Sequence, residues 1–114
     1  MPAIRSRPGK RLSIFIGEAE TWQGKPLYQV ILDIATQHRV LLAAVLRGIE
    51  GFGPEHYLNT ERLIDLVDNL PIVVEIIETP KHIERLLTRL DPLVQHGTIT
   101  MTSVEILQGP EGRA

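Results

Sequence analysis

The sequence predicts an α+β fold in which one antiparallel sheet carries two helices on one of its faces. Two segments carry apolar residues at helical spacing, and each lies between segments with strand-like apolar patterns. The resulting order is strand, helix and strand, then a polar excursion, then strand, helix and strand again. Two such units make the ferredoxin-like βαββαβ arrangement.

The composition fits one ordinary globular domain of 114 residues, with 43% hydrophobic and 23% charged residues. A formal net charge of −2 and an aromatic content of 4% argue against binding to nucleic acid. The absence of cysteine excludes disulfides, thiolate nucleophiles and cysteine-based zinc sites. No apolar run is long enough for a signal peptide or a membrane span, so we expect a cytoplasmic location and no direct membrane insertion.

The chain begins with a segment that has little to bury. Residues 1–9 contain two prolines, a glycine and two arginines, which predicts a disordered N-terminal arm, either a solvated tail or a segment that docks on an anionic partner. The folded domain is expected at residues 10–107. Alternating apolar residues at 11–16 predict its first strand, which ends at Gly17.

A polar loop at residues 17–25 leads into the first helix. Its tryptophan, Trp22, either packs over the edge of the core or borders a pocket together with Lys25. Pro26 is expected at the first helical position, and one apolar face follows it. That face consists of Leu27, Val30, Ile31, Ile34 and Ala35.

The apolar run at residues 40–46 predicts a strand that is buried on both faces. It leads to Arg47 and then to a glycine-rich turn at Gly48, Gly51 and Gly53. Glycines allow positive φ or the close approach of a ligand to the backbone, so this turn is the expected root of a binding loop. Residues 60–69 fit a helix and a returning strand equally well.

The second unit starts with an apolar strand at residues 71–77, in which only Glu75 is polar. Thr79 and Pro80 are typical of a helix start. The predicted helix has an apolar face of Ile83, Leu86, Leu87 and Leu90. In the last strand, at residues 98–107, the apolar alternation changes phase, which predicts a bulge near Thr102 and Ser103. Residues 108–114 are expected to be a tail.

The two apolar strands leave no polar face on the sheet. The helices cover one face only, so oligomerisation through the other face is the simplest way to bury it. Glu75 then faces solvent at a subunit boundary or pairs with a cation such as Arg47 or Arg62, because a buried carboxylate needs a partner. A structural role at an interface is favoured over contact with a ligand.

No catalytic or metal-binding motif is present in the sequence. The histidines are far apart, and none is paired at the spacing of a helical metal site; they are His38, His56, His82 and His96. The glycine-rich motifs of phosphate loops and dinucleotide folds are absent. We therefore expect no enzymatic activity, no metal site and no cofactor.

Three segments together resemble the PII-like proteins of domain-of-unknown-function family 190, and more distantly the PII signal-transduction proteins. They are residues 12–18, 47–53 and 68–77, in the order that the predicted elements require. The resemblance covers residues 10–107. It implies a homotrimer whose sheets line a central barrel, adenine nucleotides bound between subunits, and a loop that contacts a transporter, channel or enzyme.

This resemblance implies an effector site and a partner loop. It matches Gly51, Phe52 and Gly53 to the family's segment near the nucleotide, and Glu75 to the strand beside that cleft. To these effector-binding residues the glycine-rich turn adds Arg47 and Gly48, and the first loop adds Lys25. The expected partner loop contains Pro54, Glu55, His56, Tyr57 and Arg62. PII proteins hold phosphates with basic residues after the second helix. Here no lysine or arginine occurs between Arg89 and Arg113, so the resemblance does not extend to that clamp.

The leading hypothesis is therefore a non-enzymatic, PII-like sensor of a small effector, with an adenine nucleotide as the candidate. One alternative is a structural or metal-tolerance-type trimer that binds no nucleotide. A second is an acylphosphatase-like enzyme in which Arg47 holds a phosphate, an idea that depends on fold analogy alone.

Overall fold

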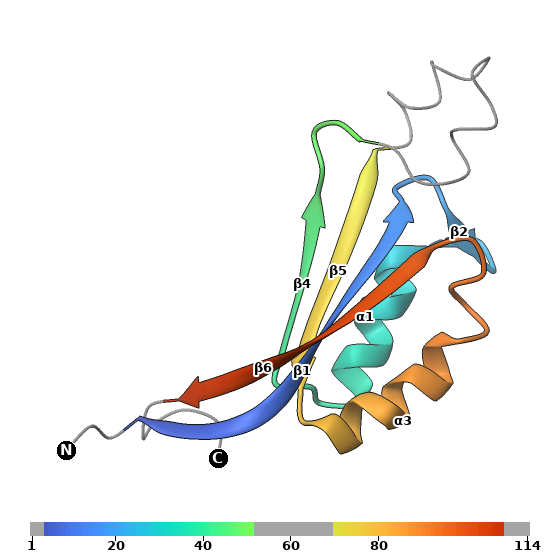
Figure 1. The fold of residues 1–114 in the computed structure, drawn as a ribbon. Coiled ribbons are helices and arrows are strands. Elements are labelled where there is room, and N and C mark those ends of the chain that lie inside the picture. The colour runs from blue at the N-terminus through green and yellow to red at the C-terminus, as the bar shows by residue number, and fades with distance from the viewer. Residues whose placement is uncertain (1–3, 52–69, 109–114) are drawn as a thin grey trace.

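The computed structural model describes residues 4–51 and 70–108, which form a four-stranded antiparallel sheet with two helices on one face (Figure 1). The strand order is β4-β5-β1-β6. The elements are β1 (Arg5–Gly17), β2 (Thr21–Trp22), β3 (Lys25–Pro26), α1 (Leu27–Gln37), β4 (Leu42–Arg47), β5 (Pro71–Glu78), α3 (Pro80–Leu90) and β6 (Thr98–Gln108). With the small β2–β3 hairpin set aside, this is the predicted ferredoxin-like βαββαβ order, and the predicted fold class is confirmed.

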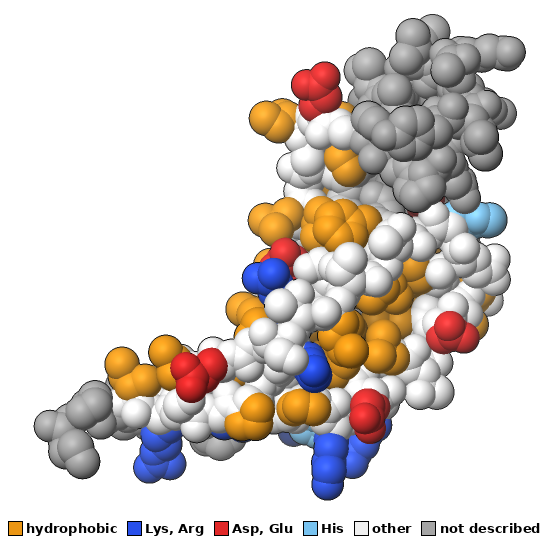
Figure 2. Space-filling view, viewed as in Figure 1, with side chains coloured by type: hydrophobic (Ala, Val, Ile, Leu, Met, Phe, Trp, Pro, Cys, Tyr) orange, Lys and Arg blue, Asp and Glu red, His pale blue; other side chains and the backbone are white. Residues whose placement is uncertain are grey.

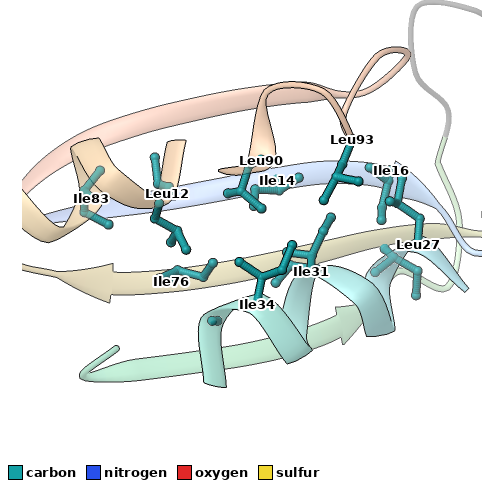
Figure 3. Close-up of a cluster of buried hydrophobic side chains, with 14 residues drawn as sticks. Leu12, Ile14, Ile16, Leu27, Ile31, Ile34, Ile76, Ile83, Leu90 and Leu93 are labelled. Carbon is teal, nitrogen blue, oxygen red and sulfur yellow. The ribbon is translucent and has the colours of Figure 1, made fainter. Parts of the chain in front are cut away.

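The central strands β1 and β5 carry the alternation that builds the core. Their inward side chains are Leu12, Ile14 and Ile16 on β1 and Ile72, Val74 and Ile76 on β5, all of them buried. These side chains meet the predicted apolar faces of the helices in one cluster (Figure 3). From α1 come Leu27, Ile31, Ile34 and Ala35, and from α3 come Ile83, Leu86 and Leu90. The cluster lies on the helical side of the sheet only.

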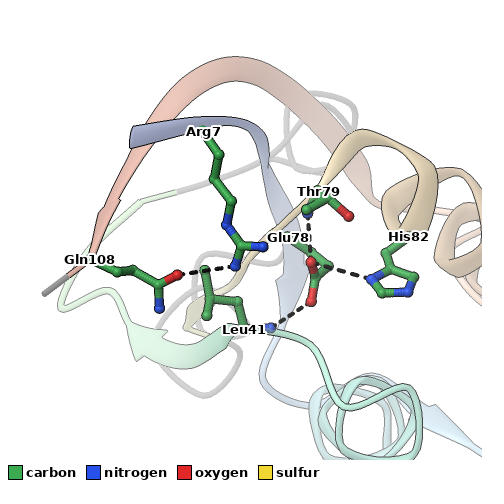
Figure 4. Close-up of polar contacts among 6 residues, drawn as sticks. All are labelled: Arg7, Leu41, Glu78, Thr79, His82 and Gln108. Carbon is green, nitrogen blue, oxygen red and sulfur yellow. Dashed lines mark hydrogen bonds and ion pairs between the residues drawn. The ribbon is translucent and has the colours of Figure 1, made fainter. Parts of the chain in front are cut away.

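A buried carboxylate fixes the end of β5. Glu78 is fully buried, and its side chain accepts the backbone N–H groups of Leu41 at 2.9 Å and Thr79 at 2.6 Å. Nδ1 of His82 lies 3.3 Å from the same carboxylate (Figure 4). Hydrogen bonds offset the cost of burying the charge, and these tie β5 to the turn before β4 and to the start of α3.

The predicted disordered arm is wrong for residues 5–9. This segment belongs to β1 and pairs with β6, from Arg5 opposite Gln108 to Gly9 opposite Val104. Side chains also link the two strands, through Ser6 and Glu105 (2.6 Å) and through Arg7 and Gln108 (3.0 Å). Figure 1 shows this two-stranded ribbon extending beyond the helices.

The predicted bulge in the last strand is also wrong. The β1–β6 pairing is continuous from Arg5–Gln108 to Phe15–Thr98, with no extra residue in either strand. The apolar pattern changes phase because the buried face changes along the ribbon. Ile99 packs against the main core, whereas Ile106 is buried against Gly9, where an added Cβ would lie 2.4 Å from its Cδ1 atom.

β4 is an edge strand whose side chains on one face of the sheet are exposed. The sequence predicts burial on both faces, and that prediction is wrong. Leu42 and Leu46 are 53% and 52% exposed on the face away from the helices, while Ala43 and Val45 pack toward the core. Phe15 on β1 is exposed on the same open face. Figure 2 shows hydrophobic side chains at the surface along the margin of the sheet that β4 forms.

Among the described residues, no helix is long and apolar enough to cross a membrane.

Candidate functional site

The candidate site lies at the edge of the sheet where β1 and β4 end and β5 begins. Gly17 and Arg47 are paired with Pro71 and Ile72, the first residues of β5. β1 and β4 both run antiparallel to β5, so their carboxyl ends come to the same edge. The residues that follow these two strands are therefore neighbours in space.

Two glycines shape the backbone after β4 as the sequence predicts. The N–H of Gly48 donates to the carbonyl of Pro71 at 2.7 Å, and a Cβ on Gly48 would lie 2.7 Å from Pro71 Cγ. Gly51 has a φ of +154°, a backbone angle that residues with a side chain rarely adopt. The turn thus requires glycine for close packing at one position and for backbone conformation at the other.

Arg47 is paired with Glu18, the residue that follows β1. Nη2 of the guanidinium contacts Oε2 of the carboxylate. The backbone N–H of Glu18 also donates to the carbonyl of Leu70 at 2.8 Å. Glu18 therefore contacts both the end of β4 and the residue that precedes β5.

The backbone around Glu18 is held in a tight turn. The N–H of Glu20 donates to the carbonyl of Gly17 at 3.1 Å, and the Glu20 carboxylate accepts the N–H of Gly17 at 3.0 Å. These bonds fix the direction in which the chain leaves β1. These hydrogen bonds thus fix the backbone from which the Glu18 side chain extends, and Arg47 contacts its carboxylate.

The guanidinium of Arg47 keeps donors that an incoming ligand can reach. The Arg47 side chain is 63% exposed, whereas that of Glu18 is 25% exposed. Arginine has five N–H donors, and Glu18 contacts one of the guanidinium nitrogens. The arrangement can bind an additional carboxylate, phosphate or carbonyl oxygen without losing the Glu18 contact.

Lys25 lies in the small hairpin on the way from Glu20 to α1. The hairpin turns at Gln23 and Gly24, which both have positive φ, and the N–H of Leu27 donates to the carbonyl of Glu20 at 2.8 Å. The Lys25 and Arg47 side chains are both cations that only donate hydrogen bonds, so they make no ion pair or hydrogen bond with each other. The neighbouring Trp22 packs against the core, which confirms the first of its two predicted roles.

Of the alternatives predicted for Glu75, the pairing with Arg47 is wrong. Glu75 lies opposite Ser13 and Ala44 on the open face of the sheet, and the Ser13 hydroxyl lies 3.4 Å from its carboxylate. Arg47 lies opposite Ile72, whose side chain points to the helical face. Ile72 and Glu75 are three positions apart in β5, so their side chains point to opposite faces of the sheet. The sheet therefore lies between Glu75 and Arg47.

The other predicted site residues lie outside the described part of the chain. They are Phe52, Gly53, Pro54, Glu55, His56, Tyr57 and Arg62, the last also named as a partner for Glu75. The alternative of helix or strand for residues 60–69 lies outside it too. Of the described candidates, the structure brings Arg47, Gly48 and Gly51 together and places Glu75 apart from them.

Glu18 is the site residue that the sequence reasoning missed. The available signal was topological. In the predicted order, the first and second main strands run in the same direction, so an acidic residue directly after the first strand lies near a cation at the end of the second. Among residues 4–51 and 70–108, no three histidine or acidic side chains come together as metal ligands.

The fold is that of the PII-like proteins. It matches the apo form of CPII, a nitrogen regulatory PII-like protein from Thiomonas intermedia K12, with a TM-score of 0.64 and 15% sequence identity, over 93% of this chain and 99% of CPII. CPII bound to ADP, AMP and bicarbonate matches with a TM-score of 0.59 and 16% identity, over 92% of each chain. At such identities the likeness establishes the fold.

The chain belongs to the DUF190 family, described as "Uncharacterized ACR", whose model matches residues 9–106. A UPF0166 protein of Aquifex aeolicus is 36% identical over 98 residues, which cover 86% of this chain and 92% of that protein. The family predicted from residues 12–18, 47–53 and 68–77 is therefore confirmed.

Proposed function

We propose that this protein is a non-enzymatic, PII-like regulatory protein that binds a small anionic effector, of the adenine nucleotide class, beside Arg47. The observation that carries the proposal is the exposed guanidinium of Arg47, held at the end of β4 next to Gly48 and Gly51. An arginine fixed beside glycines offers charge-assisted donors where a ligand can also approach the backbone. CPII, which shares the fold, has been solved with ADP, AMP and bicarbonate, and this supports the choice of ligand class.

The basic residues of the chain favour a ligand with few phosphates. β6 runs from Thr98 to Gln108 without a lysine or arginine, and its exposed side chains near β1 are mostly threonine and serine. Polyphosphate binding usually requires several charge-assisted donors. We therefore expect AMP, ADP or a small anion such as bicarbonate to bind in preference to ATP.

The proposed assembly is a homotrimer that covers the open face of the sheet. Phe15, Leu42 and Leu46 are 42% to 53% exposed there, and Val73 and Ile77 lie between them on β5. A contiguous apolar sheet face is typical of a protein–protein interface. In such an assembly the effector site at the sheet edge lies beside a neighbouring subunit, and effector binding changes contact with a transporter, channel or enzyme.

Isothermal titration calorimetry with AMP, ADP, ATP, bicarbonate and cyclic dinucleotides tests this proposal. We expect at least one of these ligands to bind the wild type. Arg47→Gln should weaken its binding about tenfold or more, since a hydrogen bond to a charged group contributes about 1.5–3 kcal/mol.

The matched control is Arg85→Gln, which makes the same change in charge at an exposed position of α3. This variant should bind like the wild type. The proposal fails if no ligand of the series binds the wild type, or if Arg47→Gln binds as tightly as Arg85→Gln does.

A further inference from the structure

We propose that Glu18 is a specificity-determining residue of the Arg47 site and selects against ligands of high negative charge. This inference rests on the function proposed above and adds to it which effectors the site accepts. It starts from the finding that the cation of the site already has a carboxylate partner before any ligand binds.

Glu18 is held in place independently of a ligand. Its N–H is bonded to the carbonyl of Leu70, and the turn between Gly17 and Glu20 is closed by two hydrogen bonds. Its side chain is three-quarters buried, and its carboxylate contacts the guanidinium of Arg47. A ligand that reaches Arg47 must therefore approach this negative charge.

The charged side chains around the site do not attract anions strongly, because carboxylates outnumber cations there. In the described segments 17–25 and 47–51, which follow β1 and close β4, the carboxylates are those of Glu18, Glu20 and Glu50, and the cations are Arg47 and Lys25. Glu18 neutralises the cation nearest to it. A monoanion or a carbonyl group can use the remaining donors of Arg47, but each further negative charge on a ligand is repelled by the fixed carboxylate.

The size of this selection follows from Coulomb's law. Two unit charges about 4 Å apart in water interact strongly enough to change an equilibrium constant about fivefold. Removing the charge of Glu18 should therefore strengthen ATP binding by about fivefold or more at low salt, strengthen AMP binding less, and leave neutral adenosine unchanged. The gain should shrink as ionic strength rises, because salt screens the charges of a ligand bound at the exposed guanidinium of Arg47.

The experiment compares the wild type with Glu18→Gln and with Glu18→Asp. Gln removes the charge and keeps the length and the backbone N–H, whereas Asp keeps the charge. Glu84→Gln, at an exposed position of α3 away from the site, is the control for net charge. Adenosine, AMP, ADP, ATP and inorganic triphosphate are titrated by calorimetry at about 0.01 M and about 1 M ionic strength, where the Debye lengths are about 30 Å and 3 Å.

The expected result is a charge-dependent gain in Glu18→Gln alone. The ratio of ATP to AMP affinity should rise by about threefold or more at low salt, and it should return toward the wild-type value at high salt. Glu18→Asp and Glu84→Gln should keep the wild-type ratio. An equal gain or loss for adenosine and ATP would show that Glu18 acts only through structure and would overturn the proposal, as would an unchanged ratio.

Inorganic triphosphate separates this inference from the proposed function. Its binding is followed through the ¹⁵N–H resonance of Gly48, which is adjacent to Arg47. If triphosphate binds Glu18→Gln more tightly than the wild type but no adenine nucleotide binds either protein, charge selection stands and the nucleotide function falls. If nucleotides bind the wild type and Glu18→Gln changes no ratio, the function stands and charge selection falls. If neither protein binds triphosphate or nucleotides, both proposals fail.

Discussion

The carboxylate of Glu78 accepts the backbone N–H of Leu41 at 2.9 Å, which joins the last residue of β5 to the segment between α1 and β4. The same side chain accepts the N–H of Thr79 at 2.6 Å, at the point where α3 begins. One fully buried side chain thus closes both crossover connections of the fold at one end of the sheet.

Glu78→Ala should therefore be strongly destabilising. The change leaves the N–H groups of Leu41 and Thr79 without an acceptor, and each unsatisfied buried donor costs about 1–3 kcal/mol. We expect the free energy of unfolding to fall by about 3 kcal/mol in urea denaturation at fixed protein concentration. Glu84→Ala, on the exposed side of α3, should change it by less than about 0.5 kcal/mol. Equal effects of the two substitutions would contradict the role of Glu78.

A second prediction concerns the contact between Gly9 and Ile106. A Cβ on Gly9 would lie 2.4 Å and 2.7 Å from two side-chain carbons of Ile106 and 3.2 Å from the carbonyl oxygen of Glu78. Gly9→Ala should destabilise the protein by about 1–3 kcal/mol, as overpacked substitutions do. In the Ile106→Ala background the same change should cost less, because the clashing atoms are gone.

A double-mutant cycle on thermal or chemical unfolding measures this coupling. Gly24→Ala provides the contrast, since Gly24 has a φ of +83° and nothing within 4 Å of an added Cβ. Its cost should come from the backbone alone and should not depend on Ile106. Additive effects of Gly9→Ala and Ile106→Ala would rule out the proposed packing.

The sequence predicts the regular elements well where periodicity is local. The strand expected at residues 71–77 is observed as β5 (Pro71–Glu78), and the helix expected after Thr79 begins at Pro80. In both segments the apolar spacing matches the face that is buried. Local pattern and tertiary packing agree there, so the prediction needs no information from the rest of the chain.

The errors occur where distant residues decide the structure. Residues 5–9 have no apolar alternation, and their strand exists because β6, about a hundred positions along the chain, pairs with them. Ile106 is buried because Gly9 lacks a side chain, a relationship that no local window contains. The link between Glu18 and Arg47 likewise requires the strand topology. Side-chain pattern within a segment cannot supply these contacts.

The open sheet face leads to a prediction about assembly. Leu46→Asp places a charge on the exposed apolar strip of β4, close to the end of that strand. If this face is buried in a homotrimer, the trimer should dissociate at concentrations about a hundredfold higher than for the wild type, because burying an unpaired charge costs several kcal/mol. Light scattering coupled to size exclusion and sedimentation across a dilution series measure the change. Arg85→Asp on α3 should leave the assembly intact, and a wild type that is monomeric at all concentrations would refute the trimer.

The pair of Arg47 and Glu18 should matter little for stability even though we assign it to the site. The Arg47 side chain is 63% exposed, and exposed ion pairs contribute about 0–1 kcal/mol. Neither Arg47→Gln nor Glu18→Gln should therefore lower the free energy of unfolding by more than about 1 kcal/mol in urea, and the small loss should vanish at high salt. A structural role would give the opposite result, a large loss that salt does not remove. Measured beside the ligand titrations, this comparison separates residues that hold the fold, such as Glu78, from residues whose charges are available to an effector.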